Sequence, residues 1–468
     1  MIDSIRGKRV LVLGLAKSGR AAVDLLIKEG ASSILANDSK ERHLLLKEMK
    51  DILRYSQVEI FGGSHPESLL EGVSLIIKSP GIKPGLPLLQ KARELGIPVF
   101  SEIELAFRFS PVPIFGITGT NGKTTTSSLI GEIFRRQFPV VYVAGNIGFP
   151  LCEAVEQARE GDIIVAELSS FQLDDINDFK VKIAAVLNLT PDHLDYHGSS
   201  ENYVEAKRKI LMNQGSDDWA VLNWDDQQVR HFSAFTKAQL LPFSRREKLN
   251  PGVYILDDII MINSGSNTFS VCRVDEVRIP GLHNLENALA ASAVAWAGGV
   301  TAEHIALALK SFSGVPHRLE RVEDISGVSF VNDSKGTNPD ATMNALRAVK
   351  GSKILIAGGL NKGSDFRGLV QSLKGEEVKS LVLLGETAPL IETIAQDEGF
   401  SDAVIVSDLI TAVYKAFSLA LPGDTVLLSP ACASWDMFRD FEERGDIFKS
   451  AVFSLKEGLE SEKSPHRK

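Results

Sequence analysis

Cysteine is scarce in this sequence, which has only Cys152, Cys272 and Cys432 in 468 residues. These positions are scattered and fit neither a paired disulfide framework nor the close spacing of metal ligands. The chain is also too long to need such staples, because its length supplies core for about three domains of ~150 residues. We therefore expect a protein of the reducing cytoplasm that is stabilised by apolar cores.

Long hydrophobic runs and an excess of positive charge are also missing. The best membrane candidate, residues 288–300, falls short of the ~20 apolar residues that a spanning helix needs, and we expect no export signal. Lysine and arginine number 51 against 60 aspartates and glutamates, which gives a net charge of -9. Such a chain has no general attraction for nucleic acid or anionic lipid. We expect a monomer that binds neither nucleic acid nor membrane and that holds anionic ligands at local sites.

Short apolar runs alternate with helical patterns along most of the chain. This alternation is typical of parallel sheets with crossover helices. Segments with proline or glycine near residues 111 and 314 mark two boundaries, and residues 220–280 form a less regular patch. We predict an α/β fold of three domains, over residues 1–108, 109–312 and 313–468, of which the first and last are Rossmann-like.

The strongest local motif is GITGTNGKTT, residues 116–125, between an apolar strand and a helix. A glycine-rich loop that opens a helix presents backbone N–H groups to phosphate. Lys123 adds a charge for the β and γ oxygens, and the Thr124 hydroxyl suits Mg²⁺. Ile117 stands where the general pattern has glycine, so the loop is a variant, and a plain strand-to-helix turn is the alternative. The motif predicts a P-loop ATPase-like α/β domain in the centre.

Two other strand ends of this domain carry polar groups. Glu167 ends the strand DIIVAE and would lie beside the glycine-rich loop if the two strands are neighbours. Its carboxylate could then hold Mg²⁺, although a solvated edge residue is the alternative. The stretch NLTPDHLDYHG, residues 188–198, contains His193 and His197, but its proline does not favour a helical zinc pair. A magnesium site with one histidine and a surface loop both remain open there.

The outer domains carry weaker phosphate motifs. GLAKSG, residues 14–19, with Asp38 after the next strand, is close to a dinucleotide fingerprint. Ala16, however, replaces the glycine that lets a pyrophosphate approach the backbone. A nucleotide-phosphate site and a turn that only packs helix on strand are both open. In the last domain, residues 332–338 and 358–363 form cationic loops, which suit either an anionic substrate or solvated turns.

A series of blocks in order resembles the Mur ligase family, the ATP-dependent amino-acid ligases of peptidoglycan precursor synthesis. The blocks are GITGTNGKTT, AGNIG, AELSSFQL, NLTPDHLDYHG, YVEAKRKI, GLHNLENALAA, GVPHRLE, NDSKGTNPDA and LLSPACASWDMF. The last three of these blocks, together with the nucleotide-type first domain, are most similar to the family members that add D-glutamate to UDP-N-acetylmuramoyl-L-alanine.

The resemblance implies ATP, two Mg²⁺ ions and a carbamylated Lys207. Lys123, His193, Lys207 and Glu167 would be catalytic, and the implied metal ligands are Thr124, Glu167, His193 and Lys207. The implied ATP-binding residues are Gly119, Thr120, Asn121, Gly122, Lys123, Thr124, Thr125, Asn284, Asn287, Arg318, Asp333 and Lys335.

The resemblance also implies two further substrate sites. The UDP-sugar substrate would meet Gly14, Leu15, Asp38, Ser39, Lys40, Ser79, Pro80, Gly81, Asn146, Ser169 and Gln172. D-Glutamate would meet Thr337, Lys362, Ser434 and Phe441.

The implied reaction is amide formation through an acyl phosphate, because a carboxylate has no adequate leaving group until ATP phosphorylates it. Alternatives are a family member that adds L-alanine or a diamino acid, a folylpolyglutamate synthase, a P-loop kinase and a non-catalytic nucleotide-binding regulator.

Overall fold

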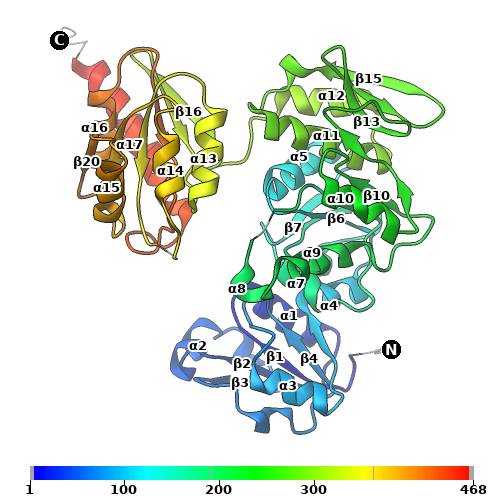
Figure 1. The fold of residues 1–468 in the computed structure, drawn as a ribbon. Coiled ribbons are helices and arrows are strands. Elements are labelled where there is room, and N and C mark those ends of the chain that lie inside the picture. Colours follow the sequence, from blue (N-terminus) through cyan, green and yellow to red (C-terminus); the bar gives the residue numbers. More distant parts are fainter. Residues whose placement is uncertain (1–4, 191, 362, 463–468) are drawn as a thin grey trace, which may run out of the picture. The chain divides into compact units, whose positions relative to one another are not determined.

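The computed structural model describes residues 5–190, 192–361 and 363–462. The chain divides into two compact units, a first unit within Met1–Arg278 and His283–Phe312 and a second within Ile279–Leu282 and Ser313–Lys468 (Figure 1). In the part that the structure describes, no helix is long and apolar enough to cross a membrane.

The first unit begins with a parallel five-stranded sheet, here called the first sheet, in the order β3-β2-β1-β4-β5. The order reverses direction between β1 and β4, and in open parallel sheets such a reversal leaves a ligand-binding crevice at the carboxyl ends of the strands. Its strands are β1 (Arg9–Leu13), β2 (Ser33–Asp38), β3 (Val58–Gly62), β4 (Leu75–Lys78) and β5 (Val99–Ser101). Its helices are α1 (Lys17–Lys28), α2 (Arg42–Glu48), α3 (Pro87–Glu94) and α4 (Glu102–Phe109).

A second parallel sheet, here called the central sheet, follows in the order β11-β10-β9-β6-β8-β7. β6 lies between β8 and β9, so the loop after β6 leaves from the middle of the sheet. The strands are β6 (Ile114–Thr118), β7 (Val141–Gly145), β8 (Ile163–Glu167), β9 (Ile183–Val186), β10 (Trp219–Leu222) and β11 (Gln239–Leu240). The helices are α5 (Lys123–Arg135), α6 (Leu151–Gln157), α7 (Ser170–Asp174), α8 (Leu194–His197), α9 (Ser200–Arg208) and α10 (Gln227–His231).

The expectation of a less regular patch over residues 220–280 is wrong. Besides β10 and β11, this segment forms a four-stranded sheet in the order β12-β13-β14-β15, with antiparallel pairing of β13, β14 and β15. The strands are β12 (Phe243–Ser244), β13 (Gly252–Leu256), β14 (Ile259–Asn263) and β15 (Thr268–Arg273), and the helices α11 (Leu282–Ala297) and α12 (Ala302–Ser311) follow. β15 is mostly exposed, so its sequence lacks the continuous apolar run of a buried parallel strand.

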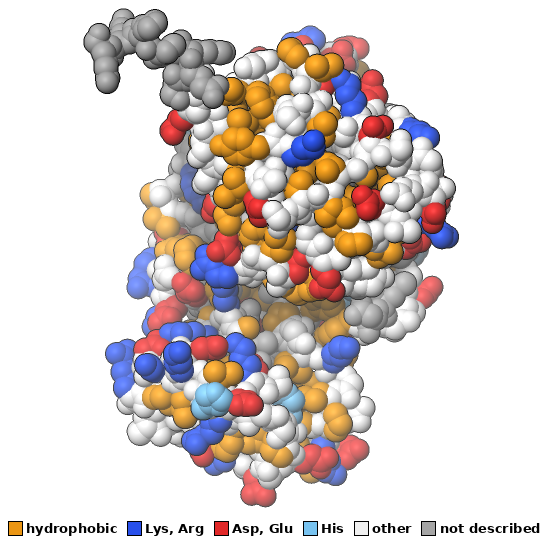
Figure 2. All heavy atoms as spheres, turned by 90° about the vertical axis from the view of Figure 1, so that its left-hand side faces the viewer, with side chains coloured by type: hydrophobic (Ala, Val, Ile, Leu, Met, Phe, Trp, Pro, Cys, Tyr) orange, Lys and Arg blue, Asp and Glu red, His pale blue; other side chains and the backbone are white. Residues whose placement is uncertain are grey.

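The second unit contains a six-stranded sheet in the order β16-β17-β21-β18-β19-β20, parallel except for the β16–β17 hairpin. The strands are β16 (Glu320–Ile325), β17 (Val328–Asn332), β18 (Lys353–Ala357), β19 (Val378–Leu383), β20 (Ala403–Ile405) and β21 (Thr425–Leu428). The helices are α13 (Pro339–Ala348), α14 (Arg367–Ser372), α15 (Ala388–Asp397), α16 (Leu409–Leu419) and α17 (Phe441–Glu462). Exposed apolar side chains such as Ile410 and Tyr414 of α16 are interspersed with charged ones on this unit (Figure 2).

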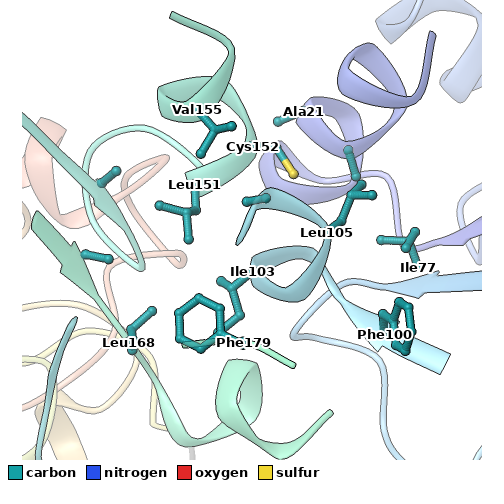
Figure 3. Packing of buried hydrophobic residues seen from close by; sticks show 14 of the residues in the cluster. Ala21, Ile77, Phe100, Ile103, Leu105, Leu151, Cys152, Val155, Leu168 and Phe179 are labelled. Atoms are coloured by element: carbon teal, nitrogen blue, oxygen red, sulfur yellow. The ribbon is translucent and has the colours of Figure 1, made fainter. Parts of the chain in front are cut away.

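The first and central sheets share one hydrophobic core. Ala21 of α1, Leu105 of α4 and Leu151, Cys152 and Val155 of α6 are buried together in it (Figure 3). α4 follows the last strand of the first sheet and packs against α6 beside the central sheet. The two sheets are therefore joined by apolar packing as well as by the chain between them.

Two buried carboxylates in the first turn of α4 strengthen this joint. Glu102 accepts a hydrogen bond from the backbone N–H of Cys152 at 2.7 Å, near the start of α6. Glu104 accepts from the backbone N–H groups of residues 177–179 and pairs with Arg108. Buried backbone N–H groups need such acceptors. Glu102 therefore fixes the start of α6, and Glu104 fixes residues 177–179.

Replacement of Glu102 by glutamine is expected to change how stability depends on pH. Burial raises the pKa of Glu102 from 4.5 to about 7, against hydrogen bonds from Cys152 that lower it. The folded protein keeps the carboxyl protonated between these pH values while the unfolded chain ionises, so this stabilisation is full below pH 4.5 and is lost as pH rises through 7. The shift corresponds to about 3 kcal/mol.

Urea unfolding of the native protein and Glu102→Gln between pH 4.5 and 8 measures this difference. We expect the free energy of unfolding of the native protein to fall, relative to the variant, by about 3 kcal/mol over that range. Glu160→Gln, at an exposed position beyond α6, is the control and should show no such trend. A difference between Glu102→Gln and the native protein that does not vary with pH would contradict the raised pKa.

Candidate active site

The glycine-rich loop spans Gly119 to Gly122, between β6 and α5. Gly119 has a φ of 153° and Gly122 a φ of 84°, which side chains rarely adopt. A Cβ atom on Gly122 would lie 2.3 Å from Oδ1 of Asn287. Glycine is therefore required at both ends of the loop, and the loop opens directly into the N-terminus of α5, where backbone N–H groups attract anions.

Two lysines converge on one carbonyl oxygen of this loop. Nζ of Lys123 donates to the carbonyl of Gly119 at 2.9 Å and to that of Thr120 at 2.8 Å. Nζ of Lys207, on α9, donates to the same Gly119 carbonyl at 2.9 Å. Burial, and then the positive charge of Lys123, hold the pKa of Lys207 well below its usual range. The site thus brings together one partly exposed ammonium and one buried amine.

Glu167 lies beside the loop because β8 pairs with β6, where Glu167 is in register with Ile117. Its side chain is 2% exposed, and its Oε1 accepts from the Asn146 amide at 2.8 Å. Oε2 is buried without a hydrogen-bond partner among the described residues, as is the hydroxyl of Thr125. The predicted adjacency of Glu167 and the loop is confirmed, and a buried oxygen without a partner suits a cation.

The segment after β9 braces the glycine-rich loop. The side-chain oxygen of Asn188 accepts from the backbone N–H of Asn121 at 2.8 Å, and its amide donates to the Asn121 carbonyl at 3.0 Å. The Thr120 hydroxyl bonds to the Thr190 carbonyl at 3.0 Å and to the Tyr203 hydroxyl at 2.9 Å. The sequence patterns assigned no role to Asn188 or Tyr203, because only the folded loop shows what they contact.

The two histidines of this segment lie in different surroundings. His193 has a φ of 51°, is about half exposed and contacts the ring of Phe171 at 4.7 Å. His197 is buried, bonds through Nε2 to the Ser170 hydroxyl at 3.0 Å and stacks on Phe171 at 5.6 Å. Among the described residues, no group of three or more His, Cys, Asp or Glu side chains forms a metal centre.

The predicted sugar residues near the central sheet are used within the fold. Ser169 and Gln172 form a reciprocal cap at the start of α7, in which each side chain bonds to the other's backbone N–H. Two residues of α11 predicted to bind ATP also bond within the fold, where Asn287 accepts from the Thr126 hydroxyl at 3.2 Å and donates to Asn284 at 3.1 Å. These polar side chains surround the loop and strand ends where the sequence analysis expected ligands.

The predicted UDP residues lie at the carboxyl ends of β1, β2 and β4 of the first sheet, where the strand order reverses. The Ser79 hydroxyl donates to the Gly14 carbonyl at 2.7 Å, across the ends of β4 and β1. Asp38, the last residue of β2, accepts from the backbone N–H groups of Leu15 at 2.7 Å and Lys40 at 3.0 Å. Asp38 therefore already accepts from one backbone N–H group of this turn. Ser39, Pro80 and Gly81 are their chain neighbours.

In the second unit, predicted site residues lie at the carboxyl ends of β17 and β21. Asp333 is buried and accepts from the Ser429 hydroxyl at 2.7 Å and the Leu319 N–H at 3.2 Å, and burial raises its pKa to about 6. Nε of Arg318 is buried without a hydrogen-bond partner among the described residues. The Lys335 ammonium lies 5.1 Å from the centre of the Phe441 ring.

Arg444 joins the two loops that carry the other predicted residues of this unit. It is 1% exposed and donates to the Ser334 carbonyl at 2.7 Å and to the Cys432 carbonyl at 3.2 Å. Thr337 and Ser434 follow shortly after these two positions in the chain. Arg444 was not predicted, because a buried arginine in a helix leaves no local pattern. Lys362, predicted to bind D-glutamate, lies outside the described residues.

Family descriptions match the chain in three consecutive ranges. They are the MurD-like N-terminal domain of Mur ligases over residues 8–101, the Mur ligase middle domain over 117–295 and the glutamate ligase domain of Mur ligases over 317–432. The chain belongs to the Mur ligase family. This family membership fits the three-domain α/β fold with a parallel sheet in each domain, whereas the exact boundaries at 108 and 312 stay predictions.

Mur ligase relatives match almost the whole chain. The UDP-N-acetylmuramoylalanine–D-glutamate ligase of Thermoanaerobacter pseudethanolicus is 48% identical over 454 residues, 97% of this chain and 99% of the relative. The protein of the same name from Clostridioides difficile is 45% identical over 453 residues, 97% of this chain and all of the relative.

A solved Mur ligase structure is similar in fold. The UDP-N-acetylmuramate–alanine ligase of Thermotoga maritima has a TM-score of 0.58 at 18% identity, with 96% of this chain and 100% of that chain covered. The MurF ligase of the same organism, solved in complex with ADP, also has a TM-score of 0.58 at 18% identity, with 96% of each chain covered.

Proposed function

We propose that this chain joins D-glutamate to UDP-N-acetylmuramoyl-L-alanine at the expense of ATP, a step of peptidoglycan precursor synthesis. The observation that carries the proposal is the match to relatives of that name at 44–48% identity over nearly the full length of both chains. The convergence of Lys123 and Lys207 on the glycine-rich loop supports a site for phosphate chemistry.

ATP would bind at this loop. The loop N–H groups and the Lys123 ammonium suit the phosphates, and a related Mur ligase structure contains ADP. Arg318, Asp333 and Lys335 of the second unit are proposed to contact the nucleotide too, as the family resemblance implies. Asn284 and Asn287 are proposed near its base.

The residues present fit Mg²⁺. This ion takes oxygen ligands and keeps phosphate or water in much of its shell, so few protein groups are needed. Thr124 and Glu167 would hold one ion, and the buried Oε2 of Glu167 without a partner supports this assignment. His193 and Lys207 would hold a second ion. Bound Mg²⁺ would neutralise charge on the phosphate oxygens.

Lys207 is proposed to carry a carbamate. Its amine would attack CO₂ to form a C–N bond, and release of one proton would leave a carboxylate-like group in place of the ammonium. The lowered pKa supports this reaction, because only the neutral amine is a nucleophile. A buried ammonium would repel a cation, whereas the carbamate oxygens would bind one.

The chemistry would proceed in two steps. A carboxylate oxygen of the alanyl substrate attacks the γ-phosphorus of ATP, the bond to the bridging oxygen breaks and ADP leaves. The D-glutamate nitrogen, after losing a proton, attacks the acyl carbon, and inorganic phosphate leaves as the amide forms. Lys123 and Arg318 would stabilise charge on the transferring phosphoryl group.

The other substrate contacts are proposed from the family resemblance. UDP would occupy the crevice of the first sheet, with Gly14, Leu15, Asp38 and Ser79 around it, and Asn146 would meet the sugar. Thr337, Lys362, Ser434 and Phe441 would bind D-glutamate. A monomer in the cytoplasm is proposed as well.

Amino-acid-dependent ADP release is expected to identify the reaction. With ATP, Mg²⁺ and UDP-N-acetylmuramoyl-L-alanine present, D-glutamate should raise ADP release at least tenfold above the rate without an amino acid. L-Glutamate and a diamino acid should give no such rise, and an L-alanine assay should use UDP-N-acetylmuramate as the acceptor. Mass spectrometry of the product should show a new amide.

Each rival predicts a different result when it is assayed with the acceptor that it needs. A ligase for another amino acid would respond to that amino acid instead, and a kinase would release ADP without forming an amide. A nucleotide-binding regulator would bind ATP without turnover. Any of these results from a folded protein would contradict the proposed reaction.

A further inference from the structure

Lys78, the last residue of β4, is a buried cation between the first sheet and the segment that carries His193. Its side chain is 1% exposed, and β4 places it in register with Leu13 of β1 and Ser101 of β5. Lysine is rarely buried so completely without a partner of opposite charge. None of the functions discussed above uses it.

Lys78 contacts two side chains from segments beside the central sheet and one carbonyl from its own loop. Nζ lies 2.5 Å from a carboxylate oxygen of Asp175, just after α7, and donates to the Tyr196 hydroxyl of α8 at 3.0 Å. It also donates to the carbonyl of Ile82 at 3.3 Å. Burial acts to lower the pKa of Lys78, but Asp175 and Tyr196 outweigh it and raise the pKa, so the side chain remains charged.

Each end of this contact is next to a predicted site residue: Ser79, predicted to meet the UDP-sugar, and His193, predicted to bind a metal ion. Lys78 directly precedes Ser79, whose hydroxyl bonds to Gly14 at the crevice proposed for UDP. Tyr196 belongs to the same turn as His193, because its backbone N–H donates to the His193 carbonyl at 3.1 Å. Phe171 packs against both rings, at 4.4 Å from Tyr196 and 4.7 Å from His193.

We propose that Lys78 is a positioning residue. It fixes the turn that carries His193 against the carboxyl ends of the first sheet's strands, where UDP is proposed to bind. This inference rests on the proposed function, because it concerns the distance between the two ends of one substrate. A long substrate anchored at its UDP end delivers its carboxylate correctly only if the reacting end of the site is held at a fixed distance. A displacement of about 1 Å can lower a rate ~10²-fold.

Lys78→Met, which keeps the length of the side chain but not its charge, tests the proposal. We expect kcat to fall 10- to 100-fold, while the Kd of UDP, measured by calorimetry, stays within twofold because UDP would touch only the first-sheet end. Lys353→Met is the matched control. Lys353 is also buried, and its ammonium donates to the backbone carbonyls of Gly351 and Glu376 in the second unit, so the kcat of this variant per folded molecule should not change.

Tyr196→Phe tests the same contact with a smaller change and decides the question if Lys78→Met does not fold. It should lower kcat about threefold to tenfold, and adding it to Lys78→Met should lower kcat no further, since both substitutions break one interaction. A kcat within twofold of the native value in folded Lys78→Met, or in Tyr196→Phe where the former does not fold, would overturn the proposal.

Hydrogen exchange separates this inference from the proposed function, because it needs no turnover. In the protein without ligands, the backbone N–H groups of Tyr196 and His197 should exchange faster in Lys78→Met than in the native protein or in Lys353→Met. Faster exchange in Lys78→Met, found together with a native protein that does not turn over the proposed substrates, would leave the positioning role intact and reject the reaction. Unchanged exchange would reject the positioning role whatever the reaction.

Discussion

Lys123→Met is expected to lower kcat for ADP release about 10²- to 10³-fold, the usual cost of removing a preorganised charge from a transition state. Lys123 opens α5 directly after the glycine-rich loop, and its ammonium is held by the carbonyls of Gly119 and Thr120. Methionine keeps an apolar side chain of similar length but cannot neutralise phosphate oxygens. We therefore expect loss of turnover without loss of fold.

Circular dichroism and thermal unfolding would check that the Lys123→Met protein is folded, and nucleotide titration would report binding. Lys310→Met is the control, since Lys310 is exposed and pairs with Glu276 on the surface, where solvent screens an ion pair. Its turnover should match that of the native protein. A folded Lys123→Met protein with turnover within threefold of the native value would show that the phosphates bind elsewhere.

Buried parallel strands and glycine-rich turns account for what could be predicted from the sequence. β1, β2 and β4 each contain a short run of buried apolar residues, and the loop at 119–122 needs glycines that a sequence displays directly. β15 was not predicted, because most of its residues are exposed and it lies at the edge of a small mixed sheet. Period and composition report burial, so a strand that is mostly exposed gives little signal.

In the candidate active site too, residues whose role follows from their place in a strand could be predicted, whereas residues whose partners lie far away in the sequence could not. The adjacency of Glu167 and the loop could be predicted, because both follow strands of one parallel sheet. Asn188 and Arg444 could not, since each acts by bonding to backbone atoms far away in sequence. Lys78 is a similar case, because its partner Tyr196 lies 118 residues further along the chain. A role that depends on a partner far away in the sequence leaves no local residue pattern.

Lys207→Ala is expected to abolish most turnover, again about 10²- to 10³-fold, if the side chain carries the proposed carbamate. The amine is 2% exposed and bonds to the Gly119 carbonyl, so the substitution leaves a cavity next to the loop. A short carboxylic acid such as acetate could enter that cavity and supply the missing oxygen ligands. Turnover should therefore recover at least tenfold as acetate is raised, with chloride at equal ionic strength as the comparison.

Lys209→Ala is the matched control for this experiment. Lys209 lies two residues further along and bonds to Asp174, away from the loop, so its turnover should change little and should not respond to acetate. Native turnover should also fall when CO₂ and bicarbonate are removed, because the carbamate would then revert to the amine. If acetate fails to restore Lys207→Ala and native turnover is independent of CO₂, Lys207 acts as an amine, and its lowered pKa makes it a neutral hydrogen-bond partner of the loop instead.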